Sequence, residues 1–142
     1  MPTRHTAPAF TVGRSSIAGA GQGLFAAVPI AAEDCMGPYT GVHLTWEALV
    51  SGPYAGSDYI LAICSDHYIV AEGPEANYTR YINHSTEPNV CLIVSTRWKT
   101  ARFEAISPIA PREEIFFNYG EDYWTSLPPY REAMLGSREL TT

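Results

Sequence analysis

The chain has 142 residues, of which 46% are hydrophobic and 17% charged, and its formal net charge is -6. This length and composition are typical of one globular domain with its own core, and they exclude a disordered chain. Because an acidic chain repels phosphate backbones, we expect no direct nucleic-acid binding and favour a basic peptide as the partner.

One helix is predicted before the middle of the chain. Thr45 can cap its N-terminus, the segment WEALVS (46–51) fills it, and Gly52-Pro53 ends it. Two shorter helical segments are also expected, a turn or two within 74–82 and a terminal helix after Pro129.

Strands make up the remaining predicted elements. Apolar runs flank the short polar segments CSDH and STRWKT, which predicts two hairpins, and one more apolar run follows them. The predicted strands span residues 58–63, 68–73, 90–94, 101–106 and 113–119.

Two segments of the chain resemble each other weakly. PIAAED (29–34) and PIAPREE (108–114) each look like a turn that enters a strand. Each leads, nine or ten residues past its isoleucine, to a tyrosine, Tyr39 in one case and Tyr119 in the other. Two short segments can match by chance, so the similarity alone predicts no repeat.

The cysteines and histidines predict neither disulfides nor a metal. Cys35, Cys64 and Cys91 are scattered and odd in number, so we expect small apolar core residues in a reducing compartment. The four histidines lack metal-ligand spacing, and no cysteine follows Cys91. No apolar run reaches transmembrane length, so we expect no membrane span, and any secretion signal would have to be non-standard.

The chemistry is concentrated in four segments, each weak when taken singly. The glycine-rich one lacks the strand–glycine–helix context of a nucleotide loop, and no GK[ST] follows it. His84 and Ser85 are adjacent without a nucleophile elbow, which argues against a serine hydrolase. The segments are GAGQGLFA (19–26), YTG (39–41), RYINHSTEPN (80–89) and EEIFFNYG (113–120).

Taken together and in this order, the four segments resemble the SET-domain family of protein lysine methyltransferases. GQGLFA is similar to the family's GxGLFA, YTG to YxG, RYINHSTEPN to RFINHSCxPN, and REEIFFNYG to GEELTFDYG. The motif-bearing core covers about residues 10–125, and 126–142 form a tail of a single domain over 1–142. The chain looks like the small, viral or bacterial single-domain members that lack the zinc-binding C-terminal segment.

The resemblance implies a mainly β fold, the β-clip SET fold. Such a fold has several small sheets, one or two short helices and a C-terminal pseudoknot that brings the third and fourth segments together. S-adenosylmethionine is then the cofactor, and the target lysine enters from the opposite face through a narrow channel. The residues that the resemblance assigns to the cofactor are Gln22, Gly23, Leu24, Tyr59, Arg80, Asn83 and His84.

Aromatic residues are implied around the lysine. Tyr119 is the central catalytic residue, with its hydroxyl at the transferring methyl group, and Tyr39 forms a wall that hydrogen-bonds the amine. Phe117 lies in the channel, which predicts di- or trimethylated product, and Tyr123 and Trp124 close it.

Four positions depart from the family pattern. Thr86 replaces the usual cysteine, Asn118 an aspartate, Arg112 a turn glycine, and Val42 a glutamate. None removes a group assigned to chemistry, although Arg112 puts the geometry of its turn in doubt.

The leading hypothesis is an S-adenosylmethionine-dependent protein-lysine N-methyltransferase acting on a basic tail, a histone before others. Its location would then be the nucleus, and otherwise the cytoplasm. One alternative is a catalytically silent SET-like module that binds only peptide or cofactor, and another is a β-rich interaction module with chance motifs. A homodimer that completes the site is left open.

Overall fold

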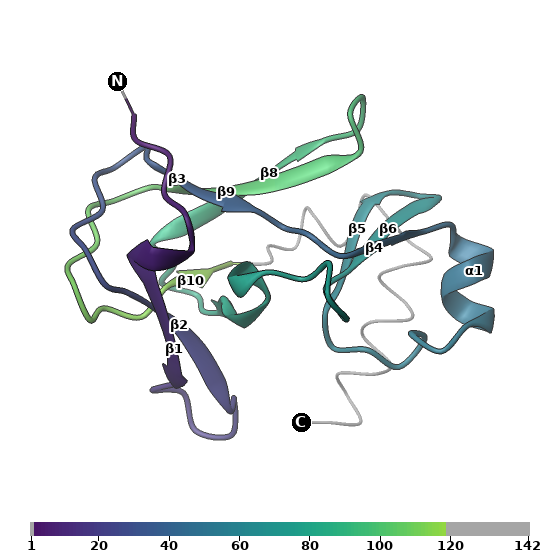
Figure 1. Ribbon diagram of the computed structural model, residues 1–142, viewed down its shortest axis with the longest axis horizontal. Helices are drawn as coiled ribbons and strands as arrows, with labels where there is room; N and C mark the ends of the chain where they lie inside the picture. Colours follow the sequence, from purple (N-terminus) through teal and green to yellow (C-terminus); the bar gives the residue numbers. More distant parts are fainter. Residues whose placement is uncertain (1, 119–142) are drawn as a thin grey trace.

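The computed structural model describes residues 2–118, which form short strands, one α-helix and two 3-10 turns (Figure 1). The elements are η1 (Ala7–Ala9), β1 (Phe10–Arg14), β2 (Gln22–Ala26), β3 (Cys35–Pro38), β4 (Val42–Leu44), α1 (Trp46–Ser51), β5 (Ile60–Cys64), β6 (His67–Val70), η2 (Tyr78–Tyr81), β7 (Asn83–His84), β8 (Val90–Ser95), β9 (Thr100–Ala105) and β10 (Phe116–Phe117).

The strands form three small sheets, as the mainly β prediction requires. β1 and β2 make an antiparallel pair, β4, β6 and β5 make a three-stranded sheet, and β3, β9, β8, β10 and β7 make a five-stranded one in that order. Figure 1 shows α1 beside the three-stranded sheet, at the end of the molecule away from the β1–β2 pair.

The locally encoded elements form where the sequence predicts them. Helix α1 has the expected bounds, and the Thr45 hydroxyl accepts a hydrogen bond from the main-chain N–H of Ala48 at 3.2 Å. Both hairpins are present, as β5–β6 and β8–β9, with strand ends within three residues of expectation. The turn expected within 74–82 is η2.

The predicted last strand, 113–119, is wrong in length among the residues described. Only Phe116 and Phe117 form β10, because the segment changes partners as it runs. Its first part bonds to β2, where the Ile115 N–H donates to the Leu24 carbonyl at 2.8 Å. Its second part lies between β7 and β8 and pairs parallel with both. The third and fourth sequence segments therefore lie side by side, as expected.

The weak sequence similarity corresponds to a structural one. Ile30 and Ile109, at the same place in the two similar segments, pair with each other through two main-chain hydrogen bonds of 2.9 Å. Three residues later, Glu33 and Arg112 both adopt positive φ, 75° and 74°. Arg112 thus keeps the left-handed turn conformation that glycine adopts most easily.

The largest core cluster joins the β1–β2 pair to the five-stranded sheet. It includes Leu24, Met36, Phe103 and Ile115, all nearly inaccessible to solvent.

The prediction that the cysteines are core residues is wrong, because Cys35, Cys64 and Cys91 are all half-buried free thiols. Cys35 and Cys91 pair in register with the half-buried Glu104 of β9, outside the core.

No helix within residues 2–118 combines the length and apolar character that crossing a membrane requires.

The N-terminal segment is fastened along β3. Arg4 pairs parallel with Cys35, and the buried Asp34 carboxylate accepts hydrogen bonds of 2.9 Å from the Thr3 N–H, the His5 ring and the Ala31 N–H. This carboxylate ties three separate points of the chain together at the edge of the five-stranded sheet.

Candidate active site

Two of the residues predicted to hold a cofactor, Gln22 and Asn83, meet where β2 and β7 come together. The Asn83 side-chain amide donates to the Gln22 carbonyl at 2.9 Å and more weakly to the Glu114 carboxylate at 3.4 Å. Asn83 is on β7, Gln22 begins β2, and Glu114 precedes β10. Three of the four sequence segments therefore meet at one side chain.

Gly23 and Leu24 contribute main chain rather than side chains to this region. Gly23 is buried, and a methyl group added there would collide with the Glu114 carboxylate and crowd Ser15. The Leu24 side chain lies in the core, with no exposed surface. We infer that any ligand contact at these positions involves the backbone.

Tyr39, Tyr59 and Arg80 form a second group. The Tyr39 hydroxyl donates to the Tyr59 carbonyl at 2.7 Å. The Arg80 guanidinium lies 4.0 Å from the centroid of the Tyr59 ring and forms a 3.3 Å ion pair with Glu72. The 3-10 turn η2, which carries Arg80, packs against β2 and ends just before Asn83, so the two groups are adjacent.

Among residues 2–118, two buried polar atoms in or next to this second group have no hydrogen-bond partner. They are Nε of Arg80 and the hydroxyl oxygen of Thr40, next to Tyr39. Buried polar atoms are rarely left unpaired, because an unmade hydrogen bond costs about 1–3 kcal/mol. Both atoms can therefore take a partner from outside residues 2–118, such as a bound ligand.

The aromatic residues expected around the lysine are described in part. Phe117 is 7% exposed, and its ring packs edge-on against Phe103 at 5.1 Å between centroids. Tyr39 packs edge-on against the same Phe103 ring at 6.2 Å. Phe103 thus connects Tyr39 and Phe117 in one aromatic row. Tyr119, Tyr123 and Trp124 lie outside the described residues.

His84 reaches this region through its main chain. It is exposed at the end of β7, and its main chain pairs with Phe117 of β10. The family resemblance assigns the main chain of His84 to the cofactor, and this assignment stays a prediction.

Two residues that sequence reasoning missed hold the site segments together. The Asn89 side chain donates to the Glu114 carbonyl and accepts from the Phe116 N–H, both at 2.8 Å. Glu114 itself is only 7% exposed. Adjacent residues of an extended chain point to opposite faces, so the pair Glu113-Glu114 before an apolar run was a signal that one of the two carboxylates faces inward.

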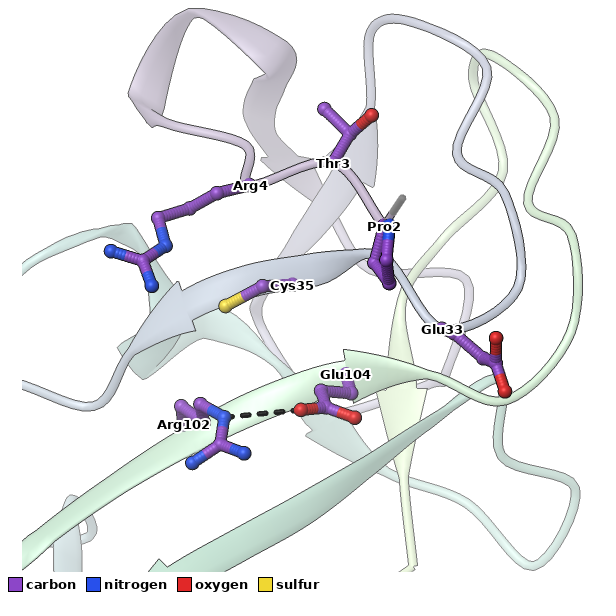
Figure 2. A pocket seen from close by; sticks show the side chains of 7 residues that line it. All are labelled: Pro2, Thr3, Arg4, Glu33, Cys35, Arg102 and Glu104. Carbon is purple, nitrogen blue, oxygen red and sulfur yellow. Dashed lines mark hydrogen bonds and ion pairs between the residues drawn. The ribbon is translucent and has the colours of Figure 1, made fainter.

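A surface hollow at the N-terminal edge lies away from these groups. Figure 2 shows Arg4 and Arg102 on either side of Cys35, with Arg102 paired to Glu104 at 3.1 Å. None of the residues predicted for cofactor or lysine lines this hollow, and its two arginines are balanced by two glutamates.

Within residues 2–118, the side chains form no cluster of three or more metal-ligand residues.

Comparisons with known proteins point in one direction. A family model described as SET domain matches residues 21–120. The histone-lysine N-methyltransferase EZH2 of Chaetomium thermophilum is 30% identical over 133 residues, which is 84% of this chain but 9% of that protein.

Solved structures resemble the chain over a similar extent. A humanized mutant of the Chaetomium thermophilum Polycomb Repressive Complex 2 bound to the inhibitor GSK126 has a TM-score of 0.68 and 28% identity, covering 84% of this chain and 15% of its own. A ctPRC2 structure in an autoinhibited conformation bound to S-adenosylmethionine has the same TM-score of 0.68 at 25% identity, covering 92% and 17%. The chain thus spans a small part of the proteins that it matches.

Proposed function

The chain belongs to the SET-domain family, and on this premise we propose that it is an S-adenosylmethionine-dependent protein-lysine N-methyltransferase. The observation that carries the proposal is the meeting of Gln22, Asn83 and Glu114, because it assembles three motif segments at one point. The matched relative is named a histone-lysine N-methyltransferase, and a similar structure was solved with S-adenosylmethionine, which supports the same assignment.

The cofactor would be held by both groups of residues described above, the one around Asn83 and the one around Arg80. When bound, S-adenosylmethionine supplies a methyl group carried on a positively charged sulfur. The main chain at Gln22 and Gly23 offers a surface without a side chain, which permits close approach. The Asn83 amide nitrogen is committed to protein oxygens, which leaves its oxygen to accept from a ligand. Arg80 and Tyr59 offer a stacked, partly buried polar surface.

The substrate amine must be neutral to attack a methyl group. A free lysine has a pKa of about 10.4, so neutrality near pH 8 costs roughly 3 kcal/mol. An apolar aromatic channel disfavours the ammonium form and lowers that cost. We assign Tyr39 to one wall of this channel, because its hydroxyl is fixed by the Tyr59 carbonyl and its ring by Phe103.

Tyr119 is proposed as the central residue, orienting the amine and stabilising charge in the transition state. Phe117 is proposed as the channel residue that sets the number of methyl groups, with di- or trimethyl-lysine as the product. The aromatic side chains of Tyr123 and Trp124 are proposed to close the channel.

The proposed substrate is a histone tail, because a chain of net charge -6 favours a basic peptide. A nuclear location and a role in chromatin follow from that substrate. The test is incubation with labelled cofactor and a panel of histones, followed by mass spectrometry of the products. Transfer to a lysine supports the proposal. Cofactor binding without transfer to any histone or cellular protein would identify a silent member instead.

A further inference from the structure

Glu114 is a buried carboxylate at the centre of the site segments. It lies in the segment that bonds to β2 just before that segment enters β10, and it pairs across from Phe25 of β2. It is 7% exposed, yet no cationic side chain is paired with it among the residues described. A buried carboxylate without a cation must be stabilised by hydrogen bonds.

Those hydrogen bonds come from the loop between β1 and β2. One carboxylate oxygen accepts from the Ser15 hydroxyl at 2.6 Å, and the other accepts from the Ser16 hydroxyl at 2.6 Å and the Ser16 N–H at 2.8 Å. The Asn83 amide adds a fourth donor at 3.4 Å. Burial acts to raise the pKa of Glu114, but these donors outweigh it and the pKa is lowered.

Gly23 completes the arrangement. The Glu114 carboxylate fills the space where a side chain at Gly23 would stand. The Glu114 carboxylate therefore occupies space that a glycine at position 23 leaves open. It accepts hydrogen bonds from the loop between β1 and β2 and from the Asn83 amide.

We propose that Glu114 is a positioning residue for the cofactor site, which holds the Ser15–Ser16 loop and the Asn83 amide at fixed places without touching the cofactor itself. This inference rests on the proposed function. The carboxylate acts before binding, because it sets the loop and the amide in the geometry that the ligand needs. Its loss should therefore weaken cofactor binding more than turnover at saturating cofactor.

Three variants test the inference. Glu114→Gln keeps the shape but turns one acceptor oxygen into a donor, which faces the hydroxyl or amide donors already there. The double change Ser15→Ala and Ser16→Ala removes two donors from a half-buried and an exposed position, with little risk to folding. Glu113→Gln is the matched control, because that carboxylate is exposed and caps only its own turn through the Ala110 N–H.

Affinity for S-adenosylhomocysteine is measured by calorimetry, turnover at saturating cofactor by product formation, and folding by circular dichroism. We expect Glu114→Gln to weaken affinity about tenfold or more, the double serine variant about three- to tenfold, and Glu113→Gln not at all. Turnover at saturation should stay within about threefold in each variant.

Parental affinity in both the glutamine and the double serine variants would overturn the inference while leaving the proposed function standing. A loss of turnover at saturation with affinity unchanged would overturn it as well. If Glu114→Gln does not fold, the double serine variant decides. If the parent itself binds no S-adenosylhomocysteine, the proposed function fails, and the inference with it.

Discussion

The hydroxyl of Tyr39 is tethered to the main-chain carbonyl of Tyr59 by a hydrogen bond of 2.7 Å. The same carbonyl also accepts the Ala71 N–H at 3.0 Å. The Tyr39 hydroxyl is therefore held in place by the backbone just before β5. If this hydroxyl is removed, the Tyr59 carbonyl still accepts the Ala71 N–H.

Tyr39→Phe should consequently cost little stability, about 1 kcal/mol or less, as expected for one hydrogen bond whose acceptor keeps a second donor. If the hydroxyl contacts the substrate amine, turnover should fall about tenfold or more. Cofactor affinity should not change. The control is Tyr54→Phe, a partly buried tyrosine that packs against a separate core cluster including Leu49 of α1 and Tyr68 of β6. Equal turnover in Tyr39→Phe and parent would remove Tyr39 from the channel.

Asn83→Ala should abolish the thermal stabilisation by cofactor. A ligand that binds only the native state stabilises it by about 2.7 kcal/mol at a hundredfold excess over its dissociation constant. S-adenosylhomocysteine should raise the melting temperature of the parent and of Thr86→Ala, an exposed change in the same loop. A rise in Asn83→Ala equal to that of the parent would contradict the assignment, as would no rise in the parent at millimolar ligand.

Tyr119→Phe should lower turnover about a hundredfold or more, since one preorganised hydroxyl acting in the transition state is lost. Cofactor affinity, measured by calorimetry, should change little. Unaltered turnover would place Tyr119 outside the reaction.

Phe117→Tyr should shift the product toward monomethyl-lysine while activity is retained. The added hydroxyl can hold a water against the amine and restrict rotation of a methylated amine, whereas phenylalanine makes no such bond. Mass spectrometry at long incubation gives the product distribution. Phe116→Tyr is the control, because this half-buried neighbour points to the opposite face of β10. An unchanged distribution in Phe117→Tyr, or a parent that stops at one methyl group, would contradict the assignment.

Asp34→Asn should lower stability at neutral pH but not in strong acid. The hydrogen bond with His5, followed by that with the Thr3 N–H, lowers the Asp34 pKa to about 2 from 3.8. A carboxylate with a lowered pKa in the folded state stabilises the fold above its unfolded value, and the effect is lost as pH falls from about 4 to about 2. The stability difference between parent and variant should be roughly 2 kcal/mol at pH 7 and shrink over that range.

Urea unfolding at several pH values measures this difference. The control is Asp58→Asn, which changes an exposed carboxylate. A difference for Asp34→Asn that stays constant down to pH 2 would show that the carboxylate charge is not the cause.

The parts of the fold predicted from the sequence are those with local signals. Helix α1 has its cap at Thr45 and its stop at Gly52, and the hairpins have their turns between neighbouring apolar runs. The strands β1, β2 and β4, which are three to five residues long, were not predicted. β3 was expected only as a strand after the turn at 29–34, and its partner β9 is distant in sequence. β7 is only Asn83 and His84, and it exists as a strand because β10 pairs with it.

The residues of the candidate site divide in the same way, into those with a local signal and those whose partners lie far away in the sequence. The meeting of Gln22 and Asn83 was expected only through the family resemblance, since 61 residues separate them. The inward turn of Glu114 was readable from its neighbour Glu113, but its partners Ser15 and Ser16 were not, because they lie almost 100 residues earlier. The similarity between residues 29–34 and 108–114 gave too little evidence by itself, although Ile30 and Ile109 pair directly.

The place of β10 between β7 and β8 has a consequence for the order of folding. In this sheet β7 bonds only to β10, so its pairing must wait for Phe116, which leaves the ribosome 32 residues after His84. Contacts of long sequence separation form late, because the loop must close before they contribute. The β5–β6 and β8–β9 hairpins can form early during synthesis, whereas the contacts around Asn83 on β7 form last. A nascent chain halted before Phe116 should therefore show hairpin structure without a ligand-binding centre.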